Sequence, residues 1–173
     1  MLNSVLAEFP TPINTQVGIY LVNGVGLLGA IVGPFLALSL KLSIKTIFVI
    51  GGALMSTALV MTVIFQLADV PAMTLISLSL LEFAWQISGG SYFFVYVSQV
   101  GNGTQMSIAN FSLWLFLLIV QTSILLDGLG LAVNFGIFAV FTILGTVRYA
   151  IQMKRTEGLS PAECKVLYAP TQY

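Results

Sequence analysis

Five apolar stretches, separated by short polar or charged segments, fill most of this chain. They run over residues 14–40, 46–68, 72–98, 106–126 and 129–152. A transmembrane helix needs about 20 consecutive, mostly apolar residues, and each stretch reaches that length. The strands of a membrane barrel would instead alternate polar and apolar residues over about 10 positions. The pattern therefore predicts an all-α integral membrane protein, a single membrane domain over residues 1–173 with five transmembrane helices.

The basic residues predict how these helices are oriented. Lys41 and Lys45 follow the first stretch, and the other four cations lie at or after the end of the fifth: Arg148, Lys154, Arg155 and Lys165. With five crossings, both groups lie on one side of the membrane, and inner-side loops carry the excess of Lys and Arg. We expect the N-terminus outside and the C-terminus inside. The inner-surface anchors would then be Lys41, Lys45, Arg148, Lys154 and Arg155.

Composition narrows the range of functions. Hydrophobic residues make up 58% of the chain and charged residues 7%, against about 25% charged residues in an ordinary soluble domain. The apolar surface must therefore meet the lipid bilayer or other membrane subunits, and a net charge of zero gives no indication of nucleic-acid binding. The chain has no His and one Cys, Cys164, which argues against a metal site and a Cys/His nucleophile. We expect neither an enzyme nor a cofactor.

Small residues recur along the first stretch. Gly29 and Gly33 form a GxxxG spacing, which lets a second helix backbone approach closely. We interpret the pair as a helix-packing surface. The alternative is a sliding surface in a moving transporter.

Glu82 is the only acidic residue well inside an apolar stretch. An ionised carboxylate facing lipid at mid-membrane costs about 2.5 to 3.5 kcal/mol, so this side chain should face protein or water, or be protonated. Gln86 lies one helical turn away on the same face. With Asn23 and Asn134, two further polar residues of the stretches, the pair forms a candidate solute-binding set. The alternative role is hydrogen bonding between helices or to a partner chain.

The clearest local motif follows the fifth stretch. Ser160, Pro161 and Glu163 match a capping box, in which Ser caps a helix, Pro takes the first helical position and Glu binds back to the cap. This motif predicts a short helix over residues 161–168 at the inner membrane surface.

Five short segments share their order and spacing with one known family. They are Lys41–Lys45, Gly90–Phe94, Ser98–Gln99, Met106–Ala109 and Arg155–Glu163. The last segment resembles the Pro-Glu-Thr-Lys-Gly-Leu-Ser-x-Glu-Glu signature that follows the final helix of sugar porters in the major facilitator superfamily. The others stand where that family has its loop between helices eight and nine, its helix-ten motif, the Ser-Glu pair after it and the start of helix eleven. The resemblance implies that the five stretches correspond to helices eight to twelve.

The chain departs from this family at charged and proline positions. Leu40 stands where the family has Asp, Gln99 where it has Glu, and Ser91 and Phe93 replace two prolines. In the family, inner-side charges form a network that latches the closed state, and the anionic members are missing here. Family helix seven and the N-terminal half have no counterpart in these 173 residues, although alternating access rocks one half against the other.

These departures lead to two functional hypotheses. The preferred one is a transport-inactive accessory or scaffold subunit, derived from a sugar transporter, in a larger membrane complex. The alternative is transport of a sugar or another small neutral solute by a half-transporter paired with another chain. Glu82, Gln86, Asn23 and Asn134 would then be the binding residues. We expect an organellar membrane, with the mitochondrial inner membrane as the leading candidate, rather than the plasma membrane.

Overall fold

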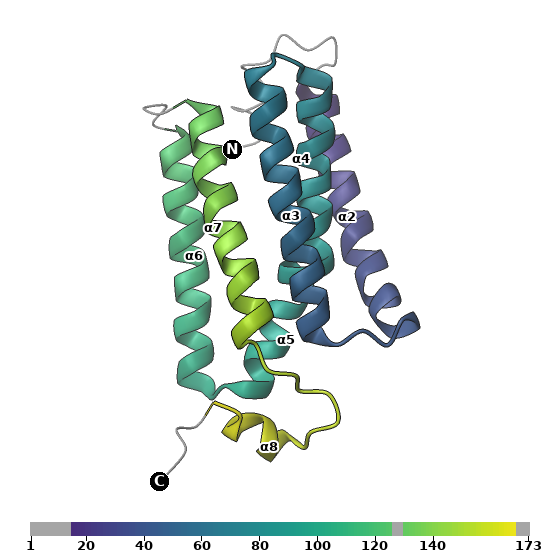
Figure 1. The fold of residues 1–173 in the computed structure, drawn as a ribbon, viewed down its shortest axis with the longest axis vertical. Helices are drawn as coiled ribbons and strands as arrows, with labels where there is room; N and C mark the ends of the chain where they lie inside the picture. The colour runs from purple at the N-terminus through teal and green to yellow at the C-terminus, as the bar shows by residue number, and fades with distance from the viewer. Residues whose placement is uncertain (1–14, 126–129, 169–173) are drawn as a thin grey trace.

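The computed structural model describes residues 15–125 and 130–168. Within these ranges the chain is helical, without strands, and forms an elongated bundle (Figure 1). The elements are α2 (Thr15–Ser39), α3 (Ile44–Leu67), α4 (Pro71–Trp85), the π-helical turn η1 (Gln86–Gly90), α5 (Ser91–Val100), α6 (Gly103–Leu125), α7 (Leu131–Gln152) and α8 (Pro161–Val166). The predicted all-α class is confirmed. In the described ranges, α2, α3 and α7 are long and apolar enough to cross a membrane.

Local sequence explains where α3 begins and ends. Ser43 caps its N-terminus, because Ser43 Oγ accepts a hydrogen bond from Thr46 N at 3.0 Å. After the last turn, Asp69 adopts a positive φ of 54°, a conformation that Asp tolerates because its short polar side chain can bond locally. Pro71 then opens α4 in the first turn, where a missing N–H costs no helical hydrogen bond. The chain therefore reverses direction between α3 and α4 within three residues.

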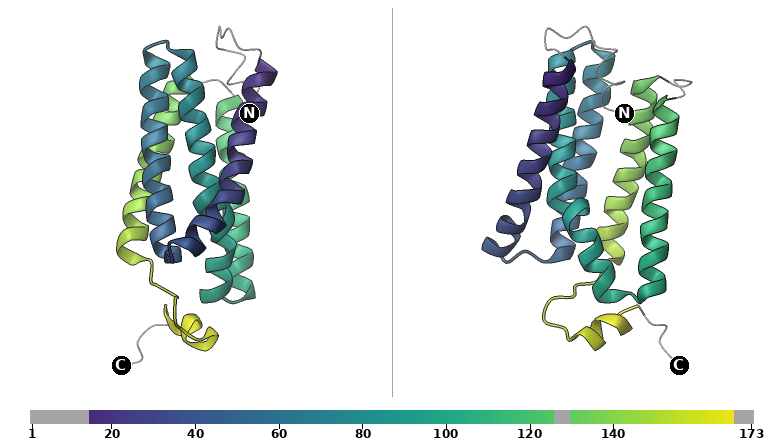
Figure 2. Two further views of the ribbon diagram at one scale, coloured as in Figure 1. Left: turned by 90° about the vertical axis from the view of Figure 1, so that its right-hand side faces the viewer. Right: turned by 180° about the vertical axis from the view of Figure 1, so that it is seen from behind.

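Helix α3 lies at the centre of the bundle. It packs against α4 on one side and α7 on the other, and α2 covers the far side of α4 (Figures 1 and 2). The core joins all three central helices through Leu59 of α3, Leu78 of α4, and Leu131, Phe135 and Ala139 of α7. A buried hydrogen bond, from Thr62 Oγ1 to Ser77 Oγ at 2.9 Å, links α3 to α4. Helix α6 stands beside α7 at the edge of the bundle and also contacts α5.

The third apolar stretch does not form one regular α-helix. The span predicted over residues 72–98 divides into α4, η1 and α5. Ser91 Oγ donates a hydrogen bond to Gln86 O, five residues back, at 2.6 Å. Gly89 has no Cβ, which would otherwise lie 2.6 Å from the Trp85 ring. Beyond this π-helical turn, α5 leaves the line of α4 and approaches α6 (Figure 1); such insertions are frequent at functional sites.

The remaining helices begin and end close to the predicted positions. Helix α6 begins at Gly103 rather than at residue 106, and α7 ends at Gln152 as predicted. The predicted end of the fourth stretch, at 126, and the start of the fifth, at 129, lie outside the described residues. Helix α8 ends at Val166 rather than at residue 168. Tyr168 instead turns back to the bundle, where its hydroxyl accepts a hydrogen bond from Lys154 N at 2.9 Å.

Helix α8 begins with the predicted capping box. Ser160 Oγ accepts a hydrogen bond from Glu163 N at 3.3 Å, and Ser160 N donates one to Glu163 Oε2 at 2.7 Å. The Ser160 side chain, and after it the Ser160 backbone N–H, hold the pKa of the Glu163 carboxyl below its usual value of 4.5. Hydrogen bonds to a carboxylate favour its charged form, so the cap and the charge stabilise each other.

The stability of α8 should therefore depend on pH. The pKa of Glu163 is lower in the folded tail than in the unfolded chain. The charged cap thus contributes fully above the unfolded value of 4.5 and is lost as the pH falls through the folded value. A carboxyl-carbon NMR titration should give Glu163 a midpoint below 4.5, and Ser160→Ala should raise that midpoint. Glu163→Gln should remove the pH dependence of α8 helicity. An unshifted Glu163 midpoint in the native chain would contradict the capping box.

Candidate functional site

The predicted polar pair forms on one face of the interrupted helix. Glu82 lies in the last turn of α4, and Gln86 is the first residue of η1. Their spacing of four residues places both side chains on the same face. Gln86 Nε2 donates a hydrogen bond to Glu82 Oε1 at 2.9 Å, and both residues are half-buried. Part of the hydrogen-bonding capacity of this carboxylate is therefore met inside the chain.

Three glycines of α2 cover this pair. A Cβ on Gly26 would lie 2.6 Å from Glu82 Cγ, and a Cβ on Gly29 would lie 2.8 Å from Phe83 O. A Cβ on Gly33 would lie 3.0 Å from the η1 backbone, at Ile87 Cα. Because the glycines carry no side chains, the backbone of α2 lies directly on α4 and η1. Glu82 therefore packs against a neighbouring helix of its own chain.

The other two candidate solute-binding residues lie on two different helices. Asn23 is exposed on α2, whereas Asn134 is buried in α7. Helix α7 packs on α3, and α3 and α4 separate it from α2 (Figure 1). The structure therefore brings Glu82 and Gln86 together but does not bring Asn134 to them.

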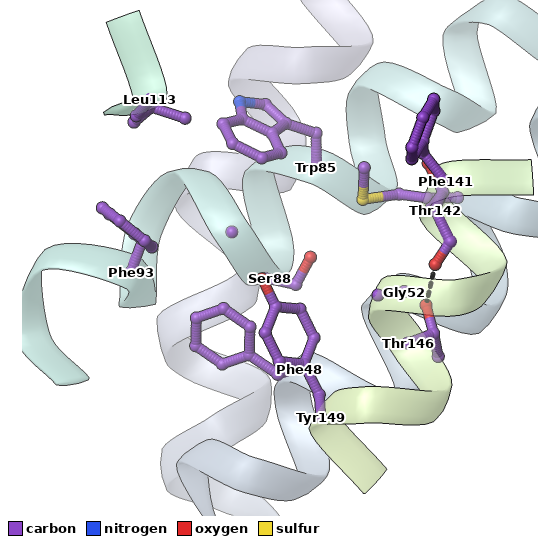
Figure 3. Close-up of a pocket in the computed structure, with 13 residues that line it drawn as sticks. Phe48, Gly52, Trp85, Ser88, Phe93, Leu113, Phe141, Thr142, Thr146 and Tyr149 are labelled. Atoms are coloured by element: carbon purple, nitrogen blue, oxygen red, sulfur yellow. Dashed lines mark hydrogen bonds between the residues drawn. The ribbon is translucent and has the colours of Figure 1, made fainter. Parts of the chain in front are cut away.

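An aromatic pocket, which sequence reasoning missed, lies between α3, the end of α4, η1, α5, α6 and α7 (Figure 3). Its volume is about 250 Å³, and its aromatic lining consists of Phe48, Trp85, Phe93, Phe141 and Tyr149. The rings of Phe48 and Tyr149 meet edge to face, with centroids 5.4 Å apart. The lining comes from six elements, so no single segment contains it. The one sequence signal is on α7, where Phe141, Gly145 and Tyr149 recur every four residues on one face.

A second pocket, of about 260 Å³, continues toward the end of the bundle that carries the basic residues. Phe48, Phe93 and Tyr149 line both pockets. The second pocket adds Arg148 and Gln152 of α7, with Tyr96, Val97, Met153 and Tyr168. We call the two pockets together the aromatic groove. It is lined by neither Glu82 nor Gln86, so the predicted polar pair and the groove are separate features.

The predicted inner-surface anchors gather at one end of the described bundle. They are Lys41 and Lys45 around the start of α3, Arg148 in the last turns of α7, and Lys154 and Arg155 directly after it. Lys154 is the most constrained of them. Its Nζ donates a hydrogen bond to Leu167 O at 2.6 Å and lies 5.3 Å from the centroid of the Tyr168 ring. The cation thus holds the end of the tail against the bundle.

Comparison with protein-family models, curated proteins and solved structures finds no match for this chain. The sugar-porter resemblance therefore stays a prediction that depends on the segments quoted above. Within the described ranges, no three His, Cys, Asp or Glu side chains gather into a possible metal site. The structure itself shows a helical bundle in which three of the described helices are long and apolar enough to cross a membrane.

The close packing of α2 predicts opposite effects for two of its glycines. Gly29→Ala would place a methyl group 2.8 Å from Phe83 O, so α2 must shift, and the bundle should lose about 1–3 kcal/mol of stability. Gly24→Ala, whose Cβ would meet nothing within 4 Å, should stabilise α2 by about 0.5–1 kcal/mol because Ala loses less conformational entropy than Gly. Thermal unfolding of both variants in one detergent measures the difference. Equal effects of the two substitutions would contradict the packed position of α2.

Proposed function

We propose that this chain is a sugar-transporter-derived accessory or scaffold subunit of a larger membrane protein complex, without transport activity of its own. The pair of Glu82 and Gln86 carries this proposal. In a working solute site these side chains would line a hydrated path near the membrane midplane. Here they bond to each other at 2.9 Å, and Glu82 packs against Gly26. That arrangement favours helix packing over solute binding.

The outer faces of the bundle support a role in assembly. Tyr20 and Phe35 of α2 expose 74% and 67% of their surface, and Phe111 and Trp114 of α6 expose 67% and 63%. Contiguous apolar surface on this scale needs a cover of lipid or protein. Both edges of the bundle therefore offer surfaces on which neighbouring membrane subunits can pack.

We further propose five membrane crossings, with the N-terminus outside and the C-terminus inside. Helix α6 has 23 residues and is about 35 Å long. The run of α4, η1 and α5 is helical from Pro71 to Val100. Both exceed the length needed to cross a hydrocarbon core of about 30 Å. The basic residues at the opposite end from Asp69 support this orientation. We place the complex in an organellar membrane, the mitochondrial inner membrane being the leading candidate, over the plasma membrane.

Five crossings place the turn between α5 and α6 on the inner side, with the tail. In a Cys164→Ser background, a membrane-impermeant maleimide should label Asn102→Cys only from the side on which trypsin cuts at Arg155. If α2, α3 and α7 alone crossed the membrane, Asn102 would lie on the outer side. Labelling and cleavage from opposite sides of sealed vesicles would therefore contradict five crossings. An N-terminal epitope tag should be accessible only from the side opposite to Arg155.

Reconstitution tests the proposed inactivity. Purified protein in liposomes should take up labelled hexose no faster than empty liposomes, and an active sugar transporter reconstituted in parallel serves as the positive control. Extracts in mild detergent should contain the chain in stoichiometric complex with other membrane proteins, which mass spectrometry identifies. Hexose uptake that Glu82→Gln or Gln86→Ala abolishes, and Gln105→Ala in the exposed first turn of α6 does not, would establish the half-transporter alternative instead.

A further inference from the structure

The aromatic groove changes in character along its length. At one end, Trp85 lies midway along the helical run from Pro71 to Val100. At the other end, Arg148 and Gln152 lie in the last turns of α7. Phe48, Phe93 and Tyr149 line both pockets and make them continuous. The groove therefore runs from an apolar interior to a cation near the end of the bundle, in the direction in which a phospholipid runs from chain to headgroup.

The apolar part of the groove offers a mostly hydrocarbon surface, whose polar side-chain groups are the hydroxyls of Ser88, Thr142, Thr146 and Tyr149 and the indole N–H of Trp85 (Figure 3). Ser88 Oγ donates its hydrogen bond to Ala84 O at 2.6 Å, and Thr146 Oγ1 donates to Thr142 O at 2.7 Å. Both hydroxyls are thus turned to their own helices. A sugar has more hydroxyls than the remaining polar groups, those of Thr142, Tyr149 and Trp85, can pair, and each hydroxyl left unpaired costs about 2–7 kcal/mol. An acyl chain needs only apolar walls, so the lining favours lipid over a polar solute.

Arg148 supplies the charge at the other end. Its Nε donates a hydrogen bond to Gln152 Oε1 at 2.9 Å, so it contacts a neutral amide. The carboxylates of the tail are engaged elsewhere: Glu157 Oε1 accepts from Ile44 N at 2.7 Å, and Glu163 Oε2 accepts from Ser160 N at 2.7 Å. The described residues at this end include all six Lys and Arg of the chain and these two acids. The excess of positive charge favours an anionic ligand.

We propose that the aromatic groove binds one anionic phospholipid, with its phosphate at the Arg148 guanidinium and one acyl chain along Phe48 and Tyr149 toward Trp85. A guanidinium can bind two phosphate oxygens at once through parallel N–H donors. Basic pockets between helices on the inner side of a membrane suit anionic headgroups. A zwitterionic lipid would bring a second cation to an end that is already positive. The site rests on the proposed membrane placement and not on the scaffold role.

Lipid binding to the purified full chain tests this site. Native mass spectrometry of delipidated protein, titrated in one detergent, should show phosphatidylglycerol bound about tenfold more tightly than phosphatidylcholine. Arg148→Gln should abolish the preference. Arg155→Gln, which changes an exposed cation outside the groove at the same end, should retain it.

A second pair of variants tests the acyl-chain path. Gly145 lines the groove, and a Cβ there would meet nothing within 4 Å, so Gly145→Leu fills open space in the groove and should weaken binding of both lipids. Gly136→Leu is the matched control, because its surroundings on α7 are equally open. It should bind lipid as the native chain does. Thermal unfolding of both variants shows that each is folded.

Three results would overturn the proposal. One is equal affinity of the native chain for the two lipids. Another is loss of the preference in Arg155→Gln to the same extent as in Arg148→Gln, which would indicate diffuse surface charge. The third is unchanged binding by folded Gly145→Leu, which would place the lipid outside the groove. If Gly145→Leu does not fold, the comparison of Arg148→Gln with Arg155→Gln is sufficient to test the proposal. Failure of the protein to insert into liposomes would instead contradict the membrane placement, so the two failures are distinguishable.

Discussion

Two adjacent glycines in the first half of α3 set how closely the bundle packs. Gly51 faces the Ser88 side chain of η1, and Gly52 faces the Thr146 hydroxyl of α7, both so close that neither position has space for a Cβ. Helix α3 therefore meets a neighbour on each side with its backbone, at the same level. Between helices in lipid there is little hydrophobic driving force, so association depends on such close contacts through small residues. The positions of η1 and α7 both follow from this pair of contacts.

The closest contact and the open groove are direct neighbours. Ser88 and Thr146, which meet the two glycines, also line the aromatic groove. Beyond Ser88, the π-helical turn directs α5 away from the line of α4 and toward α6. Space then remains between α3, α5 and α7, and the rings of Phe48, Phe93 and Tyr149 surround it. The part of the groove that these three rings surround is thus a consequence of the tight contacts at Ser88 and Thr146 combined with the change of helix direction after them.

Hydropathy located the helices because an apolar stretch of sufficient length is a local property of the chain. The capping box of Ser160 and Glu163 was predictable for the same reason, since its partners are three residues apart. The π-helical turn was not, because the polar and glycine residues of Gln86–Gly90 are too few to interrupt the hydropathy of the stretch 72–98. The positions of Asn134 and of the aromatic groove depend on which helices are neighbours. Apolar periodicity shows that a helix buries one face, but it does not show which neighbouring helix covers that face.

The tail closes the end of the bundle that carries the basic residues, with hydrogen bonds to backbone and neutral groups. Glu157 Oε1 accepts from Ile44 N at the start of α3, and Thr156 Oγ1 donates to Gln99 Oε1 near the end of α5 at 2.8 Å. In the sugar porters of the proposed origin, charges latch the corresponding end and separate when the transporter opens. Releasing Glu157 here would remove a charge-assisted hydrogen bond and an anion from the first turn of α3, where both are favourable. An end joined in this way is better suited to a fixed arrangement than to alternation between two, which is what the proposed scaffold role requires.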